Sequence, residues 1–279
     1  MNTAFQMLLS IPVLRQNYRN LDHSNACNEN CIACIFEKLA KFHLENPNKF
    51  ISVQPIARKF ATVCPTYNYG DHHDASEVIN MIMLKFDDFE PYKNIFETEI
   101  KVESMDRIIC TQCNNTFDRP IKDLVYDAQT STNIFEPIRE SIQDYKCSVC
   151  NISAGILNYE DDGIVPGVTA IKTLAQKTRF VSKLNNFSLI QLKRGDRFGN
   201  KTHIPMSFQN PLECLNKKCH TISWNQHYGQ NWNAGHWTTY VLKDQTFFLL
   251  DDHRKIPSTK KGITNNTESC FLVLKNENF

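Results

Sequence analysis

The stretch that decides the fold is Gly235-His236-Trp237-Thr238-Thr239-Tyr240-Val241, followed shortly afterwards by Phe248-Leu249-Leu250-Asp251-Asp252. Aromatic and β-branched residues dominate residues 237–242 and 246–250, which indicates two strands. The short segment 243–245 between them predicts a turn, so the two strands form a hairpin. Side chains on one face of a hairpin can meet. The sequence therefore predicts that His236 and Asp251 lie close together.

The rest of the chain gives this hairpin its setting. Residues 5–14, 31–44 and 76–86 have the apolar spacing of helices. Short β-type runs occur at residues 108–109, 124–126 and 187–192, and strands dominate after residue 187. The order is helices, then a cysteine-bearing β insertion, then an antiparallel β region. This order predicts an α+β fold rather than a doubly wound sheet.

Composition excludes several classes of protein. The 279 residues are 41% hydrophobic, which argues against wholesale disorder, and the net charge of +1 gives no sign of direct nucleic-acid binding. No apolar stretch is long enough to span a bilayer, so we expect no membrane association. The sequence holds 11 cysteines and no evident signal peptide. That combination favours metal ligands over disulfides and predicts a cytoplasmic or nuclear protein.

Two pairs of cysteines give the strongest metal signal. They are Cys110-x-x-Cys113 and Cys147-x-x-Cys150. Two thiolates separated by two residues fit the edges of a turn, and two such turns complete a tetrahedral zinc site. The β-type runs between the pairs indicate a zinc ribbon whose closed site is structural. The alternative is four buried free thiols.

A second group of possible ligands lies near the N-terminus. It comprises His23, Cys27, Cys31 and Cys34, with the last two at the start of the helix expected from residue 31. Three thiolates and an imidazole form another possible closed zinc site. The alternative is that the two helical cysteines belong to the core and the histidine is a solvated loop residue. We expect two structural Zn²⁺ ions per chain.

Four segments, in order, resemble the boxes of the ubiquitin-specific protease (USP) family of cysteine deubiquitinases, which have a papain-like fold. The segments are Asn2-Thr3-Ala4-Phe5-Gln6-Met7, Asp71-His72-His73-Asp74-Ala75-Ser76-Glu77-Val78, Leu189-Ile190-Gln191-Leu192-Lys193-Arg194, and the histidine box of residues 227–252. The cysteine pairs lie where that family carries its zinc-ribbon fingers. The resemblance implies a single domain over residues 1–279. Its parts would be a helical thumb (about 1–90), zinc fingers (91–165) and an antiparallel β palm (166–279).

The resemblance also implies a catalytic triad with one member missing. A cysteine at a helix N-terminus favours the thiolate, a histidine acts as its base, and a carboxylate orients the ring. His236 and Asp251 match the last two positions, although a lone histidine on a strand is more often structural. The nucleophile position holds Ala4. An alanine cannot attack a carbonyl, so the chain as written is predicted to be inactive.

Two explanations of Ala4 remain open. The residue could be an engineered Cys→Ala change, or the chain could be a natural or truncated pseudo-protease. The family's oxyanion donor usually lies five residues before the nucleophile, and this sequence starts three residues before Ala4. We therefore expect a chain that is inactive or incomplete by nature.

Ubiquitin, free or attached to a protein, is the partner that the resemblance implies. Asp74 and Glu77 match acidic residues that hold the arginine-containing tail of ubiquitin, although acids are also favourable in the first turn of any helix. A second hypothesis is a non-catalytic interaction scaffold that keeps the fold. A third, a zinc-ribbon nucleic-acid binder, is disfavoured by the net charge of +1.

Overall fold

The structure is a computed structural model. It describes residues 2–16, 31–46, 54–71, 73–129, 133–154, 169–195, 200–208, 211–231, 234–252, 254–259 and 263–277. No helix within these ranges is long and apolar enough to cross a membrane.

The chain forms two compact units. The first comprises Met1–Val102, Asp123–Ile134 and Leu184–Phe279, and the second comprises Glu103–Lys122 and Phe135–Lys183. The second unit is therefore built from two segments of the chain. The division of residues 1–279 into thumb, fingers and palm stays a prediction.

The helices of the first unit share one apolar core. They are α1 (Asn2–Leu9), α2 (Pro12–Gln16), α3 (Ile32–Glu45), α4 (Gln54–Val63), α5 (Ala75–Asp87) and α6 (Glu90–Ile95), and a π-helical turn, η3 (Phe96–Ile100), follows. In this core the ring of Phe86 packs against Phe36 at 5.1 Å and against Tyr92 at 4.7 Å between centroids. The three predicted helices are present. The first is interrupted at residues 10–11, because Pro12 has no backbone N–H and starts a new helix.

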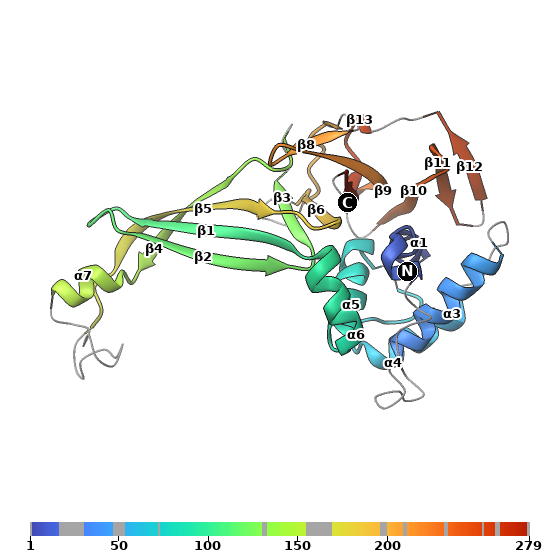
Figure 1. The fold of residues 1–279 in the computed structure, drawn as a ribbon, viewed down its shortest axis with the longest axis horizontal. Coiled ribbons are helices and arrows are strands. Elements are labelled where there is room, and N and C mark those ends of the chain that lie inside the picture. The colour runs from blue at the N-terminus through green and yellow to red at the C-terminus, as the bar shows by residue number, and fades with distance from the viewer. Residues whose placement is uncertain are drawn as a thin grey trace. The chain divides into compact units, whose positions relative to one another are not determined.

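An eight-stranded sheet forms the rest of this core (Figure 1). Its order is β12 (Arg254–Ser258), β11 (Thr246–Asp251), β10 (Ala234–Lys243), β9 (Lys217–Asn231), β14 (Ser269–Asn276), β6 (Phe187–Lys193) and β3 (Tyr126–Gln129), with β8 (Leu212–Cys214) paired to β9. All of these pairs are antiparallel except β3 with β6. A separate two-stranded sheet pairs β7 (Met206–Phe208) with β13 (Ile263–Asn266).

The hairpin expected from residues 235–252 is present as β10 and β11. Lys243 pairs with Thr246, which leaves Asp244 and Gln245 as a two-residue turn. Their φ angles are 47° and 64°, as in a type I′ turn, although neither residue is glycine. The predicted run at residues 124–126 is wrong in part. Leu124 and Val125 form a bend that packs against the core, and the strand begins only at Tyr126.

The second unit is a four-stranded antiparallel sheet with one short helix. The strands are β1 (Val102–Cys110), β2 (Thr116–Asp123), β4 (Ile138–Tyr145) and β5 (Thr173–Lys183), in the order β2-β1-β5-β4, and the helix is α7 (Ser148–Ser153). Ion pairs cross its strands: Arg179 donates to Asp106 at 2.7 Å, and Arg107 donates to Asp118 at 2.8 Å. The sheet leads to the paired cysteines at one of its ends.

Candidate active site and metal centre

Helix α1 places Ala4 in the core beside strand β10. Ala4 has no exposed surface. The preceding residue, Thr3, donates from its hydroxyl to the carbonyl of Trp237 at 3.5 Å, and its own carbonyl accepts from the Thr239 hydroxyl at 3.4 Å. Figure 1 shows α1 next to β10. The start of the helix therefore lies against the strand segment that carries His236.

His236 and Asp251 form a hydrogen-bonded pair, as the hairpin predicted. Nε2 of His236 lies 2.6 Å from the Asp251 carboxylate, and the two side chains are 48% and 30% exposed. The neutral ring therefore donates from Nε2 and keeps Nδ1 as its basic nitrogen. Within the described residues no hydrogen bond involves Nδ1, so that nitrogen is available to act as a base.

Close packing supports the strand around His236. A Cβ atom on Gly235 would lie 2.4 Å from Nε2 of His227 and 2.5 Å from the carbonyl oxygen of Tyr228. The His227 ring is buried and packs on Trp237 at 4.6 Å between centroids. Burial, together with the charge of Lys201, lowers the pKa of His227 to about 4. His227 is therefore a neutral packing residue.

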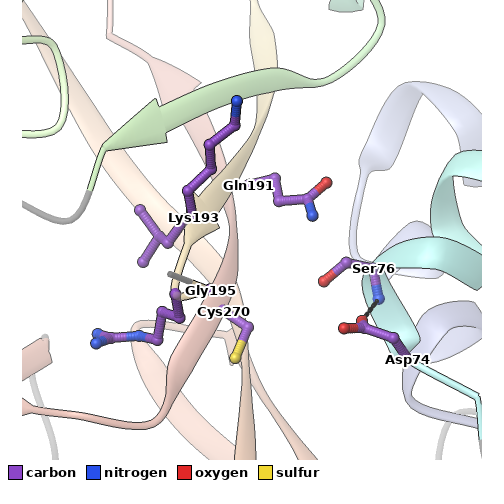
Figure 2. Close-up of a pocket in the computed structure, with 8 residues that line it drawn as sticks. Asp74, Ser76, Gln191, Lys193, Gly195 and Cys270 are labelled. Atoms are coloured by element: carbon purple, nitrogen blue, oxygen red, sulfur yellow. Dashed lines mark hydrogen bonds between the residues drawn. The ribbon is translucent and has the colours of Figure 1, made fainter. Parts of the chain in front are cut away.

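Asp74 caps helix α5 and faces a cleft. Its carboxylate accepts a hydrogen bond from the backbone N–H of Ser76 at 2.6 Å, and burial raises its pKa. Figure 2 shows both residues facing Gln191 and Cys270 across this cleft. Its lining residues are Asp74, Ser76, Gln191, Leu192, Lys193, Arg194, Gly195 and Cys270. Glu77 is exposed in the first turn of α5.

The cleft contains a thiol, but this thiol is not activated. Cys270 is buried and donates to the carbonyl of Glu268 at 3.2 Å. Burial raises its pKa to about 12. Because the thiolate is the reactive form, a thiol with this pKa is inert near neutral pH. Cys270 is therefore not a reactive nucleophile near neutral pH.

The four paired cysteines of the second unit come together at the end of its sheet. Sγ of Cys110 lies 3.8 Å from Sγ of Cys150, and Sγ of Cys113 lies 3.6 Å from Sγ of Cys147. All four sulfur atoms lie within 4.8 Å of one another. Sulfur atoms bound tetrahedrally at about 2.3 Å from a zinc ion lie about 3.8 Å apart. The cluster can therefore hold a metal ion, and its geometry is compatible with zinc.

Local structure explains how these cysteines converge. Cys110 ends strand β1, and Asn114, with a φ of 57°, turns the chain so that its N–H donates to the Cys110 carbonyl at 2.9 Å. Cys147 is the N-cap of α7, and Cys150 lies in the first turns of that helix. The first pair therefore occupies a tight turn, as the spacing predicted, and the second pair occupies the N-cap and first turn of α7.

The second predicted metal group is only half described. His23 and Cys27 lie outside the described residues. Cys31 is the buried N-cap of α3, and Cys34 is partly buried near the start of that helix. The position of the two cysteines at the helix start agrees with the expected helix, and the site itself stays a prediction.

Comparisons with known proteins agree with this arrangement. The family model described as ubiquitin carboxyl-terminal hydrolase matches residues 1–273. No curated protein sequence matches the chain. Two similar solved structures are the SAGA DUB module of Ubp8, Sgf11, Sus1 and Sgf73 bound to monoubiquitin and the same module bound to ubiquitin aldehyde.

These structural matches are extensive, although the sequences have diverged. The TM-scores are 0.71 and 0.73, with 16% sequence identity in both cases. Each match covers 99% of this chain, but only 66% and 67% of the solved chain. The likeness therefore concerns the fold, and the chain spans about two thirds of the length of the proteins it resembles.

Proposed function

Since the chain belongs to the ubiquitin carboxyl-terminal hydrolase family, we propose that it is a ubiquitin-binding USP domain that does not cleave, because Ala4 stands at the nucleophile position. Its helices, antiparallel sheets and four-cysteine cluster match the USP fold of the SAGA DUB module. One observation carries the proposal: the start of α1 is hydrogen-bonded to β10, the strand that carries His236, and His236 is paired with Asp251 on the neighbouring strand β11. A cysteine at the start of that helix would complete a triad.

The residues that remain have defined roles in this proposal. Nδ1 of His236 would take the proton of a nucleophile placed at position 4, and Asp251 would hold the ring by accepting from Nε2. The methyl group of Ala4 has no acidic proton for His236 to accept and no lone pair with which to attack a carbonyl. The chain would therefore bind the product-like end of ubiquitin without forming an acyl-enzyme.

The tail of ubiquitin would enter the cleft beside α5. Asp74 and Glu77 provide two carboxyl groups at the start of that helix, and charge-assisted hydrogen bonds to arginine are strong. Burial raises the pKa of Asp74, and a bound arginine would lower that pKa by stabilising the charged carboxylate. The neighbouring solved modules are bound to monoubiquitin and to ubiquitin aldehyde, and one contains a Cys→Ala variant of Ubp8.

Zinc would act as a structural element in this domain. We propose that Cys110, Cys113, Cys147 and Cys150 hold one Zn²⁺ and that His23, Cys27, Cys31 and Cys34 hold a second. Bound zinc would hold the four thiolates together and would stabilise a small sheet that has little apolar core of its own. Such sites need reduced cysteines, and we therefore propose a cytoplasmic or nuclear location.

Two measurements test the proposal. Titration of the purified chain with ubiquitin should give saturable binding with micromolar or tighter affinity. Ala4→Cys should then react with ubiquitin that carries an electrophile at its C-terminus, and His236→Ala in that background should slow the reaction. Absence of ubiquitin binding would favour the non-catalytic scaffold, in which the fold serves another protein partner. Binding without labelling would show that position 4 and His236 do not form a reactive pair.

A further inference from the structure

We propose that Lys201 is a positioning residue for His236, because its buried ammonium group fixes the two carbonyl groups that flank Tyr228, the cross-strand partner of His236. The inference rests on the role proposed above for His236. It assigns a function to a lysine in a polar segment that no sequence motif singled out.

The ammonium group of Lys201 is completely buried, and all three of its hydrogen-bond donors have acceptors. Its side chain is 0% exposed. Nζ donates to the carbonyl of His227 at 2.5 Å and to that of Gly229 at 2.9 Å, and it also pairs with the carboxylate of Glu268. A buried lysine needs a partner for each of its three donors, and these three acceptors supply them.

The fixed segment is the one that supports His236. Tyr228 pairs with His236 between β9 and β10, and the register of this pairing shifts between Ala234 and His236. A shift of this kind interrupts the regular ladder, so backbone pairing alone does not fix the strand there. The Lys201 contacts hold β9 at the same point. Gly235 in turn fits against the ring of His227 and the carbonyl of Tyr228.

The carboxylate partner is itself anchored. The carbonyl of Glu268 accepts from the N–H of His227 at 2.9 Å, and its own N–H donates to the side chain of Asn266 at 2.8 Å. Glu268 directly precedes β14, which also pairs with β9. The lysine therefore links the end of β9 to Glu268, a residue whose backbone is fixed by hydrogen bonds at both its N–H and its carbonyl.

The tautomer of His236 provides a direct test in the chain as it stands, with Ala4 in place. Nitrogen-15 NMR of the imidazole, assigned by comparison with His236→Gln, should show one tautomer with the proton on Nε2. Lys201→Met should convert this signal into an average of both tautomers, because the ring loses its fixed position opposite Asp251. The measurement needs no ubiquitin, so a failure of ubiquitin binding does not affect its reading.

Lys101 offers a matched control. It is also a buried lysine, 10% exposed, and it pairs with Asp87 and Glu97 in the same unit. Lys101→Met should destabilise the fold by the same kind of loss and leave the His236 tautomer unchanged. In the Ala4→Cys background, Lys201→Met should slow ubiquitin labelling about 10-fold or more, and Lys101→Met should not.

Three results would overturn the inference. One is a mixed tautomer in the parent chain, which would mean that the ring is not held. Another is an unchanged tautomer in Lys201→Met, and the third is an equal change in both lysine variants. If Lys201→Met does not fold, Lys201→Met combined with Glu268→Leu removes both buried charges together. The double variant should show the same mixed tautomer, and a single tautomer in it would refute the proposal.

Discussion

Replacing Gly235 with alanine adds one methyl group, which should displace the strand segment that carries His236. The new Cβ would lie 2.4 Å from Nε2 of His227, 2.8 Å from Cε1 of the same ring, and 2.5 Å from the Tyr228 carbonyl oxygen. Ordinary contacts are about 3.4 Å or longer, so these atoms must retreat by about 0.6–1 Å. The ring is buried against Trp237, and the carbonyl belongs to a paired strand, so neither has free space to enter.

The size of the effect follows from these contacts. Overpacking of this kind lowers the free energy of unfolding by about 1–3 kcal/mol. Alanine has less conformational entropy than glycine in the unfolded chain, and this difference raises the free energy of unfolding by about 0.4–1 kcal/mol. A net loss of about 1 kcal/mol should lower the melting temperature by about 2–4 °C. Fluorescence is a suitable probe, because Trp224 and Trp237 lie within the first unit, and Trp237 packs on the ring of His227.

A second glycine separates the effect on the site from the effect on stability. Gly70 has a φ of 100° and no neighbouring atom within 4 Å of its Cβ position. Gly70→Ala should therefore cost about 1–2 kcal/mol of backbone strain without touching His236. In the Ala4→Cys background, Gly235→Ala should slow ubiquitin labelling about 100-fold, and Gly70→Ala should leave the rate unchanged. Equal labelling rates in the two variants would refute the argument from close packing.

Three further predictions concern the metal, the cleft and the buried histidine. Elemental analysis should return two zinc ions per chain, and Cys147→Ser should remove one of them and unfold the second unit; zinc content unaffected by this change would contradict the four-cysteine site. Glu77→Arg should weaken ubiquitin binding by about 2 kcal/mol by titration calorimetry, whereas Asp88→Arg, at the exposed opposite end of α5, should have little effect. The pKa of His227 is about 4 in the fold against its ordinary 6.5, so the unfolded chain takes up the proton first. Stability should therefore be complete above pH 6.5 and fall by about 3 kcal/mol as the pH drops to 4. Urea unfolding followed by tryptophan fluorescence should show this slope, and His227→Phe should flatten it.

The parts of the site that the sequence predicts are those set by local geometry. His236 and Asp251 meet because a two-residue turn fixes the register of β10 and β11. Within each pair the two cysteines lie close together because the x-x spacing fits a tight turn at Cys110–Cys113 and a helix start at Cys147–Cys150. Asp74 lies where a helix start was expected, and it caps α5. In each case a few neighbouring residues determine the result.

The parts that sequence analysis missed depend on contacts between distant segments. Lys201 lies in a polar stretch with no periodicity, and its importance comes from carbonyl groups 26 and 28 residues away. The parallel pairing of β3 with β6 brings together residues that are more than sixty positions apart. The tight fit of Gly235 depends on the ring of His227 in the next strand. No local pattern records such contacts.

The place of β14 in the sheet has a consequence for how the protein is made. This strand, among the last residues of the chain, lies between β9 and β6 rather than at an edge. During synthesis β9 and β6 therefore each have one edge without a partner strand until Ser269–Asn276 has left the ribosome. Until then the sheet consists of two separate halves. Each half has an edge strand with unpaired backbone N–H and C=O groups, which can bind a chaperone or pair with another chain and aggregate. A chain that ended just before residue 269 would thus contain the described helices and the β10–β11 hairpin, but its sheet could not close.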